Sequence, residues 1–460
     1  MPPRKRASAQ REGISVRTRW GWGPSASAKK SSVRQAMSPA IADRALKTVD
    51  SCADEIVDFT CRLIRVPTVN PPGDCYPDCA NLVGETLAGH GFDVEYFPAD
   101  GRPEHTAEHP RVNVVARRRG RAARPALHLN GHIDVVPPGH GWTLDPFGGI
   151  VRNGRIYGRG ACDMKAGLAA AIFAAEAIRR TGITLEGTLE ISATVDEESG
   201  GFAGVAWLAE RGHLTSAHSD YVIIPEPLDV ERICLGHRGV YWFEVETRGH
   251  IAHGSMPFQG VSAIEHMGVV LDRFRRELVP ALATRRTAMP VVPDAARHAT
   301  FNINGISGGQ PVDGIQTPCV ADTCRAAFDR RFLAEERFDD VKGEIESLLA
   351  RAAADTPGLD CVLRDLMVVH PTSAPERSPL VAAMERSVRE VLGREAAHVA
   401  SPGTYDQKHF DRIGGIRDVV AYGPGRLDVA HQPDEWCSIE DLINATKVIA
   451  LAILELTQHA

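Results

Sequence analysis

Residues 189–201, LEISATVDEESGG, join a short apolar run to a cluster of acidic side chains. Leu189–Val195 has the length and the composition of a buried strand. Asp196, Glu197 and Glu198 follow it directly. The stretch therefore predicts polar chemistry at the end of a buried strand.

Three other apolar runs are followed by polar residues in the same way. They are Ala126–Leu129 before His132 and Asp134, Tyr221–Ile224 before Glu226, and Asp418–Tyr422 before a Gly-Pro-Gly turn and His431. Lys165–Arg180 and Phe202–Arg211 have the composition of helices between such strands. This alternation predicts a parallel, doubly wound α/β sheet, which binds ligands outside the carboxyl ends of its strands. We therefore expect all four polar groups at one edge of the sheet.

Residues 240–366 follow a different pattern. A strand over 240–247, a helix over 261–278, strands over 300–306 and 321–331 and a helix over 337–351 predict a small two-layer α+β domain. Apolar strands return after residue 395, so this domain interrupts the larger one.

The larger domain is expected to begin with two helices, over 41–66 and about 77–90. The predicted organisation is a disordered basic tail (1–40), a catalytic domain in two parts (41–239 and 367–460) and an inserted lid and dimerisation domain (240–366).

The charge of the chain is unevenly distributed. The net charge is −7, yet the first 36 residues hold nine Lys or Arg and one acid. The remainder is therefore strongly acidic and should repel the phosphates of nucleic acids. The basic segment lacks apolar periodicity, which predicts a disordered tail or an upstream start with Met37 as the true first residue. A targeting role is the alternative.

Cysteines and apolar runs bear on location. The ten cysteines include no Cys-x-x-Cys pair, and the N-terminus lacks the apolar core of a secretory signal. The apolar runs are far shorter than the ~20 residues that span a bilayer. We expect a soluble cytoplasmic protein with reduced thiols that acts on a small molecule and binds neither nucleic acid nor membrane.

Five of the polar residues have the composition of a metal site: His132, Asp163, Glu198, Glu226 and His431. Two imidazoles and three carboxylates suit zinc, cobalt or manganese, and the set differs from a thiolate site. Three carboxylates offset most of the charge of two divalent cations, and one carboxylate can bridge the pair. A water between the two ions then becomes a nucleophile near neutral pH.

Two further carboxylates are expected to act without binding metal. Asp134 lies two residues after His132 on the same face of the strand, where it can accept the second imidazole N–H. Glu197 is adjacent to Glu198, and adjacent side chains point in different directions. One of the two is therefore expected to ligate while the other faces the water, and a metal-free carboxylate beside that water is a natural general base.

These residues resemble those of the aminoacylase, acetylornithine deacetylase, succinyl-diaminopimelate desuccinylase and glutamate carboxypeptidase family of di-zinc metallohydrolases. The resemblance runs from about residue 50 to the C-terminus. Its motifs are Gly131–Pro137, Trp142 with Asp145-Pro146-Phe147, Gly158-Arg159-Gly160, Asp163-Met164-Lys165, Asp196–Gly201, Glu226-Pro227 and Ala430-His431-Gln432. It implies a zinc-peptidase-like catalytic domain with a mixed sheet and an inserted ferredoxin-like lid.

The resemblance also implies a role for each residue. Asp163 bridges two metals, His132 and Glu226 complete one site, Glu198 and His431 complete the other, and Glu197 activates the water. Zinc is the expected ion, with cobalt and manganese as alternatives. A cis peptide is expected at Asp163–Met164.

One lid residue is expected to act in another subunit. His253 resembles a histidine that enters the active site of a neighbouring subunit and stabilises an oxyanion there, with His250 as the competing choice. The resemblance therefore predicts a homodimer through the lid.

Arg331, Gly403 and Thr404 are the expected substrate-binding residues. Arg331 resembles an arginine that grips a substrate carboxylate, with a surface salt bridge as its alternative. Gly403 and Thr404 resemble a loop that lines the substrate pocket. Departures from the family pattern lie in the lid segments Thr287–Thr300 and Pro318–Ala321, and in the loop positions Tyr405, Gln407 and His409. All of them concern substrate recognition, so an unusual substrate is expected.

The leading hypothesis is metal-dependent hydrolysis of a C–N bond in a small carboxylate-bearing amide, such as an N-acyl amino acid, with Glu197 as the base. The alternatives on the same site are a dipeptidase or carboxypeptidase, and a hydrolase of formyl or carbamoyl amides or of activated aryl amines. A non-catalytic metal-binding homologue is the alternative of another class.

Overall fold

The computed structural model describes residues 38–310, 318–375 and 377–458 of the 460-residue chain. The predicted tail therefore lies almost wholly outside the described residues. The first helix, α1 (Pro39–Ser51), begins where that tail was expected to end.

The four predicted strands are neighbours in one sheet. They are β6 (Thr188–Thr194), β3 (Ala126–His132), β7 (Tyr221–Pro227) and β15 (Val419–Gly423), in that order across the sheet. All three pairings among them are parallel. The carboxyl ends of these strands therefore meet at one edge, as the sequence predicted.

The remaining strands make this nine-stranded sheet a mixed one. They are β1 (Asp93–Pro98), β2 (Val112–Arg118), β8 (Arg232–His237), β13 (Thr372–Ser373) and β14 (Ala397–Ser401). The pairs β1–β2, β2–β6, β8–β15 and β8–β13 are antiparallel. A separate three-stranded sheet contains β4 (Ile150–Arg152), β5 (Arg155–Tyr157) and β16 (Trp436–Ser438).

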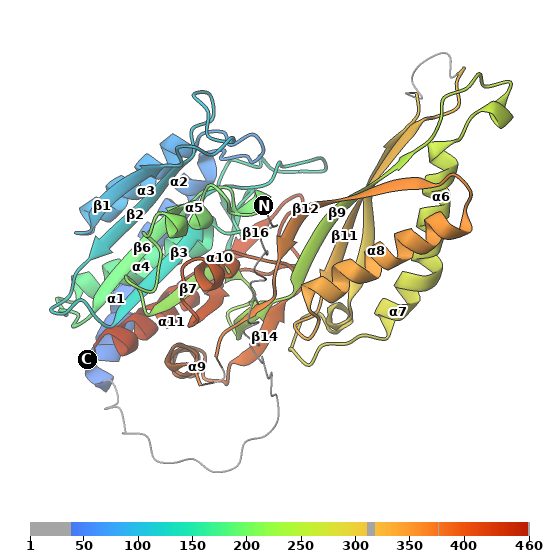
Figure 1. Ribbon diagram of the computed structural model, residues 1–460. Coiled ribbons are helices and arrows are strands. Elements are labelled where there is room, and N and C mark those ends of the chain that lie inside the picture. Colours follow the sequence, from blue (N-terminus) through green and yellow to red (C-terminus); the bar gives the residue numbers. More distant parts are fainter. Residues whose placement is uncertain (1–37, 311–317, 376, 459–460) are drawn as a thin grey trace, which may run out of the picture. The chain divides into compact units, whose positions relative to one another are not determined.

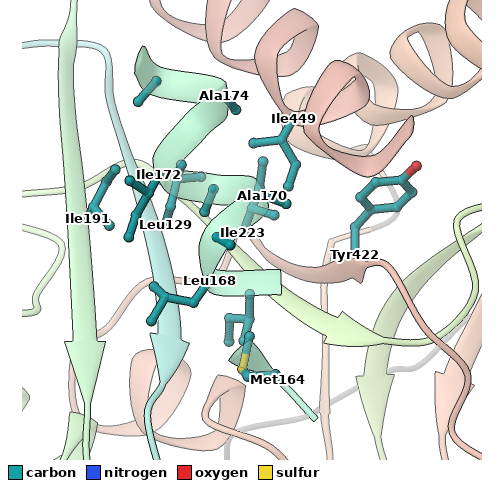
Figure 2. Packing of buried hydrophobic residues seen from close by; sticks show 14 of the residues in the cluster. Leu129, Met164, Leu168, Ala170, Ile172, Ala174, Ile191, Ile223, Tyr422 and Ile449 are labelled. Atoms are coloured by element: carbon teal, nitrogen blue, oxygen red, sulfur yellow. The ribbon is translucent and has the colours of Figure 1, made fainter. Parts of the chain in front are cut away.

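Helices α4 (Lys165–Arg180) and α11 (Ile439–Thr457) cover the apolar face of the parallel strands. Leu129 of β3 and Ile191 of β6 lie beside Ile172 of α4, and Ile449 of α11 lies beside Ala170 of the same helix (Figure 2). The other helices of the larger domain are α2 (Ala53–Arg65), α3 (Tyr76–Gly89), α5 (Val205–Glu210), α9 (Pro379–Leu392) and α10 (Gln407–Arg412).

The prediction of one helix over 41–66 is wrong. The structure has two helices, α1 and α2, with a break at Cys52. The Cys52 N–H donates to the main-chain oxygens of Thr48 and Val49, so the last turn of α1 tightens. A new helix, α2, begins at Ala53.

The inserted region contains a second, four-stranded sheet with its own apolar core. Its elements are β9 (Gly239–Arg248), α6 (Ala263–Arg273), a π-helical turn (Phe274–Leu278), α7 (Val279–Ala283), β10 (Thr300–Gly308), β11 (Thr323–Phe332), α8 (Phe338–Asp355) and β12 (Asp360–Val369) (Figure 1). The strand order β10-β11-β9-β12, with α6 and α8 packed on the sheet, is a ferredoxin-like arrangement. Strand β12, which the sequence pattern had not predicted, completes it.

Among the helices of the described residues, none has the length and apolar composition needed to cross a membrane.

Candidate metal centre and active site

The structure brings all five predicted metal ligands together at the carboxyl edge of the parallel strands. One group of side chains that could hold an ion contains His132, Asp163 and Glu226, and a second contains Asp163, Glu198 and His431. Within each group the donor atoms lie within 4.8 Å of one another. Asp163 belongs to both groups, so the two candidate sites share one carboxylate.

The shared carboxylate lies between the two histidines. His132 Nε2 is 3.1 Å from Asp163 Oδ1, and His431 Nε2 is 3.4 Å from Asp163 Oδ2. His431 Nε2 is also 3.1 Å from Glu198 Oε1. The Asp163–Met164 peptide is cis, as expected.

The electrostatics of this cluster favour a bound cation. Burial and the charge of Asp163 raise the pKa of Glu198 to about 7, and they raise the pKa of Glu226 well above its usual value. Hydrogen bonds to Asp163 and Glu198 raise the pKa of His431 to about 10. Carboxylates that repel one another in a buried cluster are stabilised by divalent cations, and this mixture of nitrogen and oxygen donors fits such ions. The residues present therefore fit a pair of metal ions.

Asp134 orients the acidic turn. The expectation was that its carboxylate accepts the second N–H of His132. The structure places His132 Nδ1 3.0 Å from the main-chain oxygen of Asp134 and 3.5 Å from Oδ1. The carboxylate also accepts the main-chain N–H groups of Glu197 and Glu198, each at 3.1 Å, and an N–H of Asn70 at 3.0 Å. Asp134 therefore fixes the turn that presents both glutamates.

Glu197 contacts α10 through its carboxylate. Its carboxylate accepts a hydrogen bond from Lys408 Nζ at 3.3 Å, and the Lys408 side chain is only 4% exposed. Asp406 is buried nearby, where its Oδ2 accepts an N–H of Asn130 at 3.2 Å. Burial, opposed by the charge of Lys408, raises the pKa of Asp406 to about 7.

Sequence analysis assigned no role to Lys408 or Asp406. The available signal was their position, because Asp406 ends the Gly-Thr loop that the resemblance placed at the substrate pocket and Lys408 lies two residues beyond it. The contact of Lys408 with Glu197 joins residues 211 positions apart in the chain, which local patterns do not report.

The predicted lid residues lie outside this cluster. His253 is exposed, and its Nδ1 accepts the main-chain N–H of Ser255. Arg331 forms a two-pronged ion pair with Asp329 of the same strand, at 2.8 and 2.9 Å. Their roles toward substrate stay predictions.

The predicted substrate loop is tied to the extra lid segment. Gly403 and Thr404 are half-buried. Just before them, the main-chain oxygen of Pro402 accepts two hydrogen bonds from Arg238, at 3.2 and 3.0 Å. Arg238 also donates to the main-chain oxygens of Ala296 and His298, at 2.8 and 2.9 Å, in the extra segment. The segment and the loop therefore share one buried guanidinium.

Comparison with known proteins points to a single family. The model of peptidase family M20/M25/M40 matches residues 128–455. A succinyl-diaminopimelate desuccinylase of Thioalkalivibrio sulfidiphilus is 29% identical over 84% of this chain and 95% of its own length. The N-formyl-4-amino-5-aminomethyl-2-methylpyrimidine deformylase of Bacillus subtilis is 28% identical over 88% of this chain and 95% of its own. The crystal structure of human carnosine dipeptidase 1 superposes with a TM-score of 0.73 at 21% identity, covering 91% and 99% of the two chains.

Proposed function

Because the chain belongs to peptidase family M20/M25/M40, we propose that it hydrolyses the amide bond of a small carboxylate-bearing substrate with two metal ions and Glu197. It is a metal-dependent hydrolase, and the curated relatives that it matches include desuccinylases and a deformylase. The observation that carries the proposal is the pair of donor groups that share Asp163.

Five side chains hold the ions. His132 and Glu226 complete one site, Glu198 and His431 complete the other, and Asp163 belongs to both. When bound, the metal pair supplies Lewis acidity and lowers the pKa of water near it. Zinc is the preferred ion because imidazole and carboxylate donors suit it, and cobalt and manganese fit the same donors.

Glu197 moves the proton. Its carboxylate takes a proton from the attacking water and returns it to the leaving amine. Asp134 holds the turn through the N–H groups of Glu197 and Glu198, so the base and the ligand keep opposite orientations. The ammonium of Lys408 donates a hydrogen bond to the Glu197 carboxylate and so helps to hold it in place.

Replacement of Glu197 by Gln tests this assignment. The variant keeps the shape of the side chain but cannot take a proton, so kcat should fall by about 10²–10⁴-fold while two metal ions stay bound per chain. Glu198→Gln is the matched control, because it should lose metal as well as activity. Metal content by atomic emission alongside steady-state kinetics separates the two outcomes. Metal loss in Glu197→Gln would contradict the assignment of Glu197 as the base and Glu198 as the metal ligand.

The substrate class is a small N-acyl compound with a free carboxylate. Arg331, Gly403 and Thr404 are proposed to bind that carboxylate and line the pocket. A panel of N-succinyl, N-acetyl, N-formyl and dipeptide substrates distinguishes a deacylase from a deformylase or a dipeptidase. A formyl substrate is the second candidate, because one relative at 28% identity is a deformylase. Absence of turnover across the panel by metal-loaded protein would indicate a non-catalytic homologue.

We further propose a cytoplasmic homodimer in which residues 240–366 form the lid and the dimer contact. Strand β10 is the edge of the lid sheet, and Ile303 and Ile306 on it are 45% and 57% exposed. An exposed apolar edge strand favours pairing with a second copy. The ten free cysteines support a reducing compartment.

A further inference from the structure

A buried ion pair outside the donor cluster joins the segments that carry the donors. Arg159 and Glu435 are each 1% exposed, and Arg159 Nη1 donates to Glu435 Oε2. They lie 276 residues apart in the sequence. Arg159 belongs to the loop before α4, and Glu435 directly precedes β16.

Glu435 fixes the main chain at the shared carboxylate. Its Oε1 accepts the main-chain N–H of Cys162 at 2.8 Å and that of Asp163 at 3.1 Å. Two consecutive N–H groups on one oxygen set the orientation of the peptide that precedes the Asp163 side chain. Asp163 is the residue on which both donor groups depend.

Arg159 fixes the two histidine segments. Its Nη2 donates to the main-chain oxygen of Pro138 at 3.2 Å, in the segment that follows His132 and Asp134. Its Nη1 donates to the main-chain oxygen of Gln432 at 3.3 Å, directly after His431.

The pair is also enclosed by an aromatic ring. The guanidinium carbon of Arg159 lies 5.3 Å from the centre of the Trp142 ring, and Trp142 Nε1 donates to the same Pro138 oxygen at 2.7 Å. A planar guanidinium suits several carbonyl oxygens and an aromatic face at once, which a lysine ammonium cannot match.

We propose that Arg159 and Glu435 are positioning residues that clamp three ligand-bearing segments and so preset the spacing of the two donor groups. This inference rests on the proposed metal-binding function. Donors that repel one another before an ion arrives need a rigid support, and a buried ion pair is stable only when further hydrogen bonds satisfy it. Here those bonds go to the main chain at Asp163, directly after His431, and at Pro138 in the segment that follows His132.

Metal retention by Glu435→Gln tests the clamp without relying on activity. The purified full-length chain is loaded with Co²⁺, and the visible spectrum and the rate of cobalt transfer to excess EDTA are recorded. Because the variant removes the charge that holds Arg159 and the Asp163 peptide, cobalt affinity should fall about 10–100-fold and the spectrum should change.

Glu190→Gln is the matched control. Glu190 is 1% exposed and paired with Arg117 at 2.6 Å, but its hydrogen bonds go to Arg117, His128 and Ser219. This variant should lose stability while its cobalt spectrum and release rate stay those of the wild type. A Glu435→Gln protein that behaves like this control overturns the inference.

If Glu435→Gln does not fold, a second variant, Arg159→Lys, tests the same inference. Arg159→Lys keeps the charge but loses the fork that reaches Pro138 and Gln432, so it should release cobalt faster than the wild type. Wild-type retention by this variant also overturns the clamp. A wild-type chain that binds no cobalt overturns the proposed function together with the clamp, so the two failures are distinguishable.

Discussion

Glu197 and Glu198 are neighbours in the chain, yet their carboxylates meet different partners. Glu198 lies against His431, and Glu197 lies against Lys408. The turn that carries both glutamates begins at Asp196, which has a φ of 60°. The carboxylate of Asp196 accepts hydrogen bonds from Tyr76 and Arg111. A left-handed residue costs conformational energy that these two contacts offset.

Residue identity predicted the donors better than it predicted their supports. Each donor is a His, Asp or Glu, residue types that commonly bind metal ions, and His132, Glu198 and Glu226 lie at or near the ends of strands. Lys408 and Glu435 carry no such signal, because a lysine or a glutamate in a loop is usually solvated. Only the folded chain shows them buried against Glu197 and Asp163.

Acid should destabilise the protein through buried histidines. Burial and the charge of Lys408 lower the pKa of His409 to about 3, so the imidazole is neutral in the folded chain. The unfolded chain binds a proton near pH 6.5, and stability is therefore lost as the pH falls from 6.5 toward 3. At pH 5 this residue alone should cost about 2 kcal/mol relative to pH 7.

His409→Gln checks this linkage. Urea unfolding at pH 7 and pH 5, with EDTA present in all samples, should show a smaller loss of stability in the variant by about 2 kcal/mol. His218, an exposed histidine, provides the control variant. An identical pH dependence in all three proteins would contradict the assignment.

Helix α4 approaches the sheet closely at its single glycine, Gly167, so a larger residue there should destabilise the chain. A Cβ added to Gly167 would meet the main-chain oxygen of Pro225 in β7 well inside van der Waals contact. A Cβ added to Gly343 in α8 meets nothing within 4 Å.

The two glycines therefore make a matched pair. Gly343→Ala should stabilise the chain by about 0.5–1 kcal/mol through helix propensity. Gly167→Ala gains the same propensity but should destabilise by about 1–3 kcal/mol because the backbone must shift. Thermal unfolding measures both. A stabilised Gly167→Ala protein would show that α4 does not pack on β7 in this way.

The four parallel strands that the sequence predicted in the larger sheet are buried along almost their whole length. β3 and β6 are buried along their whole length, and their continuous apolar runs stand out. β1 and β12 are largely exposed or half-buried, so their composition resembles that of loops. The break between α1 and α2 was missed for a related reason, because apolar periodicity continues across Cys52 while the backbone does not.

At the scale of the whole molecule, the proposed role of His253 in a neighbouring subunit predicts that one chain alone is inactive. His253 is exposed on the lid and hydrogen bonds to Ser255 in its own chain. If it serves the site of a second copy, a His253→Ala chain retains an intact base and a Glu197→Gln chain retains an intact histidine. Mixed dimers of the two inactive variants should regain up to about one quarter of wild-type activity, because random exchange pairs half of the chains and each mixed dimer has one complete site.

Subunit exchange needs its own readout in this experiment. Differently tagged variants that co-purify after mixing establish the exchange, and each variant mixed with itself is the control. No recovery of activity in co-purified mixed dimers would place His253 outside catalysis in trans.

The guanidinium of Arg238 has a consequence for engineering. Because it ties Pro402 to the segment around Ala296, the loop with Gly403 and Thr404 cannot be transplanted alone. A chimera that carries the Gly403–Thr404 loop of another protein must also carry that protein's version of the segment around Ala296. Otherwise the four hydrogen bonds from the Arg238 guanidinium to main-chain oxygens are lost. Laboratory evolution toward new substrates should accordingly yield paired changes in the two segments.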